Sequence, residues 1–155
     1  MHVLEQQQDL PASVEEVWDF IKTPKNLNAI TPDDLDFEFL GDLPDEMYNG
    51  LLIRYRIGIP MFGKWNWVTE IKHIREGISF IDEQRFGPYK FWYHYHEVRS
   101  IEGGTRMIDR VHYKLPFGPL GEIVHVLQVK GMLNKIFSFR QKKMKELFPG
   151  HTEST

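Results

Sequence analysis

Hydrophobic positions near the start of the chain follow the spacing of a helix. Apolar side chains recur at i, i+3, i+4 and i+7 along residues 14–21. Ser13 is suited to cap this helix, and Glu16 three positions later completes a capping box. A second short apolar pattern starts at Pro24, a residue favoured in a first helical turn. The pattern therefore predicts two short helices after an initial strand over residues 1–10.

The middle of the chain changes to alternating apolar and polar positions. This period of two, typical of strands, runs from about Leu35 to about Leu115. Turn signals separate the runs at Gly77, Gly87-Pro88 and Gly103-Gly104. We expect about six strands in an antiparallel meander, which makes about seven with the first strand.

The last part of the chain returns to helical spacing. Residues 120–148 contain no proline, and their apolar positions recur near every third or fourth residue. A continuous helix of this length would extend about 40 Å. Gly131 is expected to mark a bend or a close packing contact, and Pro149-Gly150 to end the helix. We predict one domain over residues 1–150, followed by a polar tail over 151–155.

Composition and charge exclude several classes of protein. The chain has 155 residues and a net charge of −3, which argues against a nucleic-acid-binding protein. It has no cysteine, so disulfides, thiolate metal sites and cysteine nucleophiles are excluded. The first ten residues lack an apolar signal core, and no stretch is apolar enough to span a bilayer. We expect a cytoplasmic monomer or homodimer without stable membrane insertion.

Two histidines are expected on the inner face of the sheet. In the stretch 91–98, His94 and His96 share a face with apolar neighbours. A two-residue turn at Gly103-Gly104 would place His96 opposite Val111 and His94 opposite Tyr113. The same register places Asp109 opposite Val98, as a diagonal neighbour of His96.

The preceding hairpin allows two registers. A two-residue loop at Gly87-Pro88 would put Gln84 on the face opposite the histidines, whereas a three-residue loop sets Asp82 opposite His94 and Gln84 opposite Trp92. We favour the three-residue loop because it keeps the less charged faces together. The predicted ligand-binding residues on this inner surface are Tyr55, Trp65, Trp67, Asp82, Gln84, Trp92, His94, His96, Asp109 and Tyr113.

Such a cluster has more than one interpretation. Buried imidazoles and carboxylates are costly unless they are paired or solvated, so they predict either a satisfied polar network or a wet ligand pocket. His94 and His96 with an aspartate could also hold a divalent metal, but no third ligand has diagnostic spacing, so neither a metal nor another cofactor is expected. No motif places a nucleophile beside a base.

Cations accumulate along the C-terminal helix. They form either a solvated face, which we favour, or a surface for an anionic partner. The residues are Lys130, Lys135, Arg140, Lys142, Lys143 and Lys145.

The order of elements resembles the helix-grip fold of START and birch-pollen-allergen-type proteins. Within the SRPBCC superfamily, the chain is most similar to the bacterial polyketide cyclase/dehydrase-like ligand-binding group. The stretches that carry the resemblance are 11–20, 26–32, 80–89, 92–96, 104–111 and 137–140. It implies an α+β fold: a curved seven-stranded antiparallel sheet wrapped around a long C-terminal helix, two short helices after the first strand, and a cavity between sheet and helix.

The resemblance also implies functions for that cavity. The leading hypothesis is binding, without catalysis, of a small hydrophobic or aromatic ligand that is lipid- or polyketide-like. The alternative is a cyclase- or dehydratase-like enzyme in which a His–Asp pair acts as general acid and base, with candidate residues Asp82, His94, His96 and Asp109. A third hypothesis, a helix-mediated interaction protein, requires an exposed apolar stripe on the 120–148 helix.

Overall fold

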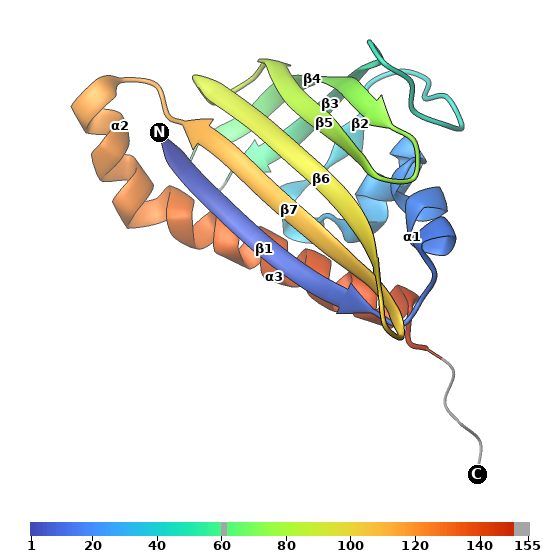
Figure 1. Cartoon of the computed structure of the whole chain (residues 1–155). Helices are drawn as coiled ribbons and strands as arrows, with labels where there is room; N and C mark the ends of the chain where they lie inside the picture. Colours follow the sequence, from blue (N-terminus) through green and yellow to red (C-terminus); the bar gives the residue numbers. More distant parts are fainter. Residues whose placement is uncertain (60–61, 151–155) are drawn as a thin grey trace.

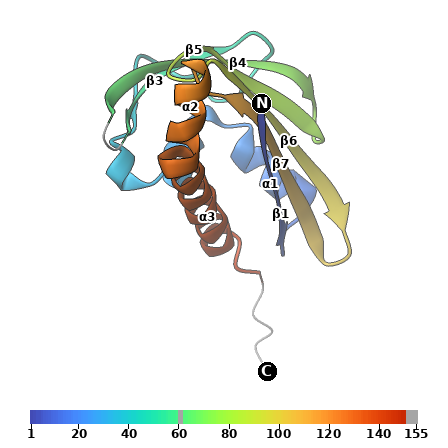
Figure 2. The ribbon, with the colours of Figure 1, turned by 90° about the vertical axis from the view of Figure 1, so that its left-hand side faces the viewer.

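A curved antiparallel sheet arches over one long C-terminal helix in the computed structural model, as Figures 1 and 2 show. The structure describes residues 1–59 and 62–150. The seven strands lie in the order β1-β7-β6-β5-β4-β3-β2. This arrangement confirms the predicted α+β helix-grip architecture, while the predicted tail over 151–155 lies outside the described residues.

The elements follow the predicted order. They are β1 (His2–Leu10), α1 (Val14–Ile21), η1 (Pro24–Ile30), η2 (Asp33–Leu35), β2 (Glu38–Phe39), β3 (Leu52–Ile59), β4 (Gly63–Arg75), β5 (Ser79–Phe86), β6 (Phe91–Ile101), β7 (Gly104–Lys114), α2 (Gly118–Val124), η3 (His125–Val129) and α3 (Lys130–Leu147). The second short helix, η1, is a 3₁₀ helix, and η3 is a π-helical turn between α2 and α3.

The first helix is held by the predicted cap and by its apolar stripe. The hydroxyl of Ser13 accepts a hydrogen bond from the Glu16 backbone N–H at 3.2 Å, which satisfies one of the free donors of the first turn. The stripe buries Val17 completely and Trp18 almost completely. The Trp18 ring meets Phe80 of β5 edge-on, so α1 packs against the sheet.

The hairpin between β6 and β7 is shifted by two residues from the predicted register. Ile101 pairs with Gly104, so the turn is made by Glu102 and Gly103, with Gly103 at a φ of 82°. Gly104 lies inside β7 instead, where a Cβ would stand 2.0 Å from the Leu10 carbonyl oxygen. A shift of two residues preserves the face of every side chain. The predicted pairings were wrong, but the predicted inner face was right.

The alternation of β4 breaks near its end. The register with β5 shifts between Lys72 and Arg75, where His73 takes a left-handed φ of 53°. Such a bulge adds one residue to a strand and turns the following side chains over. As a result His73 is exposed and Ile74 packs on the core, contrary to the simple alternation expected from the sequence.

The C-terminal helix is interrupted earlier than expected. Its irregularity is the π-turn at His125–Val129, whereas a Cβ on Gly131 would meet no atom within 4 Å. Gly131 therefore marks no close contact. Beyond the turn, α3 buries Leu133, Phe137 and Met144 beneath the sheet.

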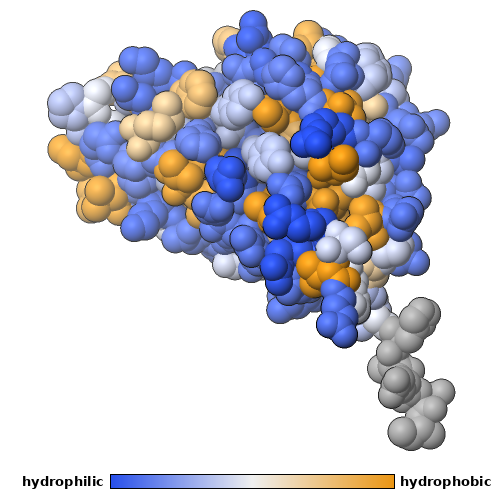
Figure 3. Space-filling view, in the orientation of Figure 1, coloured by the Kyte–Doolittle hydropathy of each residue, from blue (hydrophilic) through white to orange (hydrophobic). Residues whose placement is uncertain are grey.

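The part of this helix before α3 instead exposes apolar side chains. Hydrophobic side chains gather at the α2 end of the mostly polar face shown in Figure 3. The exposed apolar residues of this part are Phe117, Leu120, Ile123, Val126 and Leu127. No helix among the described residues is long and apolar enough to cross a membrane.

Candidate functional site

A cavity of about 190 Å³ lies between the inner face of the sheet, the short helix η1 and α3. Aromatic rings form much of its wall. They are Phe20, Phe37, Tyr55, Trp67, Phe80, Tyr89, Trp92 and Phe137. Tyr55 and Trp67 are cross-strand partners in β3 and β4, and their rings stack with centroids 5.6 Å apart. The cavity therefore has an apolar, ring-lined body.

Two histidines and two aspartates form a closed polar network on the cavity wall. In β6, His94 and His96 point to the same face, and their rings stack with centroids 3.6 Å apart. The strand pairing sets Asp82 of β5 opposite His94, as predicted, and Asp109 of β7 opposite His96. Each carboxylate can therefore reach both imidazoles.

The contacts within this network alternate between histidine and aspartate. His94 Nε2 lies 2.8 Å from Asp109 Oδ1, and His96 Nε2 is hydrogen-bonded to Asp82 Oδ2. The second nitrogens complete the ring of contacts, with His94 Nδ1 at 3.4 Å from Asp82 and His96 Nδ1 at 3.3 Å from Asp109. Every ring nitrogen thus faces a carboxylate oxygen, so each N–H that the two imidazoles carry has an acceptor.

The two histidines have opposite charge preferences. Burial and the neighbouring His96 lower the pKa of His94 despite the two carboxylates beside it. Burial also opposes charge on His96, but hydrogen bonds to Asp109 and Asp82 outweigh it and raise the pKa of His96 to about 9. At pH 7 His94 is therefore neutral and His96 is charged.

Both aspartates stay ionised. Burial alone would raise their pKa values, but His94 and His96 hold the pKa of Asp109 well below its usual range. The same histidines, helped by Arg140, lower the pKa of Asp82. With two carboxylates, one imidazolium and the Arg140 guanidinium, the polar end of the cavity sums to zero charge.

Two further polar groups of residues on the cavity wall have no hydrogen-bond partner among the described residues. The buried atoms Arg140 Nε and Trp67 Nε1 are unpaired donors. The guanidinium of Arg140 lies over the Phe137 ring at 5.1 Å. The buried Tyr55 also lines the cavity, and Asp82 and Arg140 lie close enough to act on the pKa of its hydroxyl.

Seven of the ten predicted ligand-binding residues lie on the cavity wall. They are Tyr55, Trp67, Asp82, Trp92, His94, His96 and Asp109. The alternation of the five strands β3 to β7 brings them together even though one hairpin register differs from the prediction.

The other three predicted residues lie off the cavity. Trp65 is 40% exposed near the hairpin between β3 and β4, where its indole N–H donates to the Phe62 carbonyl. The Gln84 amide closes the β5–β6 loop through two hydrogen bonds to the Tyr89 backbone. Tyr113 turns to the start of the C-terminal helix, where its hydroxyl lies 2.7 Å from His125 Nε2. Alternation fixes the face of a strand residue, but not how far the cavity extends along that face.

Sequence reasoning missed the contribution of α3. Phe137, Arg140 and Met144 line the cavity from this helix. We had expected Arg140 among the solvated cations, but it faces the interior. Its spacing of three from Phe137 and four from Met144 was the available signal, because residues at these spacings share a helix face.

Comparisons with known proteins support the fold. No family model and no curated protein sequence matches the chain. Among solved structures, it is similar to protein CV1439 from Chromobacterium violaceum, with a TM-score of 0.72 and 11% identity over 97% of this chain and 100% of that one. The chain is also similar to a START superfamily protein from Mycobacterium smegmatis, with a TM-score of 0.69 and 12% identity over 95% of this chain and 99% of that one.

A third similar structure is a longer protein. The chain matches a nucleoside-diphosphate sugar epimerase from Corynebacterium glutamicum with a TM-score of 0.65 and 21% identity, over 92% of this chain and 28% of the epimerase chain. At these identities the similarity concerns the fold. The chain thus has the helix-grip fold found in START superfamily proteins.

Proposed function

We propose that the protein binds a small, largely aromatic ligand in the cavity between the sheet and α3. The observation that carries this proposal is a ring-lined cavity whose lining residues include Arg140 and Trp67, each with a buried, unpaired hydrogen-bond donor. Ligand sites are typically apolar pockets with a few convergent polar groups. In an ordinary hydrophobic core, side chains would fill this cavity and the donors of Arg140 and Trp67 would be hydrogen-bonded.

The volume of the cavity limits the ligand. A cavity of about 150 Å³ is large enough to hold benzene. A volume of about 190 Å³ therefore suits one ring or a small fused system. A long acyl chain would require the cavity to open, so we favour a compact aromatic ligand over a lipid.

The unpaired donors select a ligand that carries an acceptor oxygen. Arg140 Nε and Trp67 Nε1 donate but cannot accept, and Tyr55 can donate as well. Because the surrounding charges sum to zero, a neutral carbonyl fits this end of the cavity without leaving an unbalanced buried charge. The proposed ligand is an aromatic carbonyl compound.

A matched series of probes tests the proposal. Naphthalene, 2-acetylnaphthalene and 2-naphthoate share a ring system and differ in the acceptor they carry. We expect 2-acetylnaphthalene to bind at least tenfold more tightly than naphthalene, measured by calorimetry and by quenching of tryptophan fluorescence. R140M should remove most of this preference and leave naphthalene binding in place. The exposed K135M serves as the control.

Two outcomes would contradict the proposal. If no probe binds up to its solubility limit, and none is retained in native mass spectrometry, the cavity does not bind compact aromatic ligands. If the acetyl group gives no advantage in the wild type, the unpaired donors do not select the ligand.

One observation favours a catalytic alternative. His96 and Asp82 are partly accessible, with side-chain exposures of 16% and 20%, so the network is open on the side where it lines the cavity. The carboxylate of Asp82 can accept a proton from a carbon next to a ligand carbonyl, and the charged His96 can donate to the oxygen. This is the proton transfer that aldol closure and dehydration require.

Proton exchange tests the alternative directly. In D₂O, the methyl protons of bound 2-acetylnaphthalene should exchange faster than in buffer, followed by NMR. D82N and H96Q should each return exchange to the buffer rate while the probe still binds. If the wild type gives no acceleration, the site binds without acid–base catalysis on this class of compound.

A further inference from the structure

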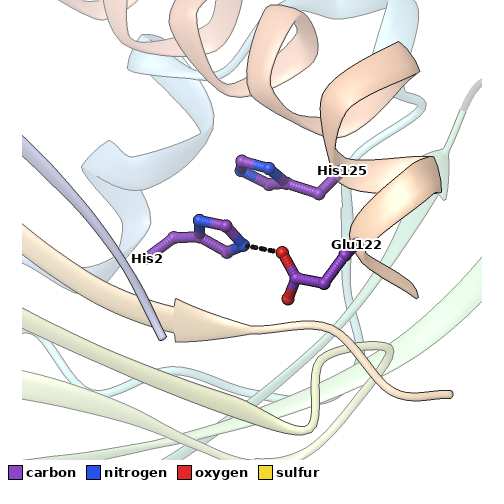
Figure 4. Close-up of side chains that lie close together, drawn as sticks. All are labelled: His2, Glu122 and His125. Carbon is purple, nitrogen blue, oxygen red and sulfur yellow. Dashed lines mark hydrogen bonds and ion pairs between the residues drawn. The ribbon is translucent and has the colours of Figure 1, made fainter. Parts of the chain in front are cut away.

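A second cluster of potential metal ligands lies outside the cavity, where β1 begins and α2 ends (Figure 4). It consists of His2, Glu122 and His125. A ring nitrogen from each histidine and a carboxylate oxygen of Glu122 all lie within 4.8 Å of one another. These residues come from two segments more than a hundred positions apart, so only the folded chain brings them together.

The fold fixes all three side chains at one place. His2 is the first residue of the edge strand β1 and pairs with Tyr113 of β7. Glu122 and His125 are three positions apart on the helix, a spacing that puts both on one face. His2 Nε2 lies 2.8 Å from Glu122 Oε2, and the rings of His2 and His125 stack with centroids 3.6 Å apart.

The state of His125 points to a ligand. The residue is only 5% exposed, and its Nδ1 has no hydrogen-bond partner among the described residues. Its other nitrogen, Nε2, lies 2.7 Å from the hydroxyl of Tyr113. When Nε2 carries the proton and donates it to that oxygen, Nδ1 presents a free lone pair. Histidines that bind metals are held in this way by a hydrogen bond from the second nitrogen.

We propose that His2, Glu122 and His125 bind one divalent transition-metal ion such as zinc. Two imidazoles and one carboxylate are a common zinc ligand set, with water in the fourth position. Tyr113 acts as a positioning residue that selects the tautomer of His125. The ion would connect the start of β1 to the helix that precedes α3.

The proposal requires a small adjustment of the two rings. In stacked imidazoles the lone pairs lie in nearly parallel planes, and these two rings are inclined by only 12°. Around a tetrahedral zinc ion, ligand atoms stand about 3.3 Å apart at bond lengths of about 2.0 Å. Binding therefore tilts one imidazole out of the stack and replaces the His2–Glu122 hydrogen bond with two bonds to the metal.

The cavity network is a less suitable metal site. Asp82, His94 and His96 also bring their ligand atoms within 4.8 Å. Each of their ring nitrogens already faces a carboxylate, as the contacts with Asp82 and Asp109 show. A metal there would have to displace these contacts, whereas His125 Nδ1 has no hydrogen bond to lose within residues 1–59 and 62–150.

Calorimetric titration of zinc into chelator-treated protein without a polyhistidine tag tests the proposal. We expect one ion per chain. H125Q, H2Q and E122Q should each weaken binding at least tenfold, and Y113F about 10- to 100-fold. The exposed H73Q is the matched control and should bind as the wild type does. Circular dichroism and 2-acetylnaphthalene binding check that each variant folds.

NMR of the histidine rings supplies a second measurement that a purely structural role would not change. Zinc should shift the ring resonances of His2 and His125 and leave those of His94 and His96 in place. The proposal is overturned if the wild type binds no zinc, if H125Q binds as tightly as the wild type, or if binding is lost only in H96Q.

Discussion

The two histidine clusters of this protein differ in how completely they are paired. In the cavity network, Asp82 and Asp109 face all four ring nitrogens of His94 and His96. In the cluster at the start of β1, the one carboxylate, that of Glu122, pairs with His2, and His125 Nδ1 has no partner among the described residues. The first arrangement is a polar network complete within the protein, and the second is incomplete. A metal ion is therefore expected at the incomplete cluster rather than at the complete one.

The largest expected difference is in stability. Asp109 accepts from both histidines, so D109N leaves the charged His96 with one of its two carboxylates and should lower the free energy of unfolding by about 3 kcal/mol. Glu122 is half-exposed, so E122Q should cost less than about 1 kcal/mol without metal. Urea unfolding of both variants measures the contrast. Equal losses would show that the two clusters do not differ as described.

The pH dependence of stability should separate the clusters next. The pKa of His96 is raised to about 9 in the folded protein from 6.5, so its contribution is fully present below pH 6.5 and is lost as the pH rises through 9. The shift corresponds to about 3 kcal/mol at most. Urea unfolding of wild type and H96Q at several values between pH 6.5 and 9.5 checks this. A wild type and variant that lose stability in parallel would contradict it.

Zinc should act on the other cluster alone. At a free concentration 100 times the dissociation constant, an ion that binds only the folded state adds about 2.7 kcal/mol to stability. We expect this gain in the wild type and in H96Q, and not in H125Q. Thermal unfolding with zinc and with a chelator measures it. A gain retained in H125Q would place the metal elsewhere.

The smallest expected effect is that of Tyr113 without metal. Y113F removes the hydroxyl that pairs with His125 Nε2 and should cost about 1 kcal/mol. The matched change Y93F, on the other face of β6, should leave stability within about 0.5 kcal/mol of the wild type. Urea unfolding in chelator distinguishes the two. An equal cost would mean that the Tyr113–His125 contact contributes nothing of its own.

Features with a local period were predictable from the sequence. Alternation put His94, His96, Asp82 and Asp109 on one inner face, and an error of two residues in the β6–β7 register left that face unchanged. The spacing of apolar residues, together with Ser13 as the capping residue, predicted the first helix. These patterns depend on neighbours along the chain, so they can be read without knowing how the elements pack.

Features that depend on how distant elements meet were not predictable in the same way. The orientation of Arg140 toward the cavity follows from how α3 lies under the sheet. The meeting of His2 with His125 requires the edge position of β1 and a π-turn that no apolar period indicates. Trp65 shares its strand face with Trp67, yet it lies beyond the end of the cavity.

The π-turn also sets the rotational phase between the two parts of the C-terminal helix. A turn of this kind contains one residue more than an α-helical turn, and each residue advances a helix by about 100°. The extra residue lets the segment 118–124 face β1 while Leu133, Phe137 and Met144 of α3 face the core. Deleting Val126 would therefore rotate α2 by about 100° relative to the sheet and move His125 away from His2. The residues of α3 that line the cavity would stay in place. One residue of chain length thus acts as an angular offset between the cluster at the sheet edge and the ligand site.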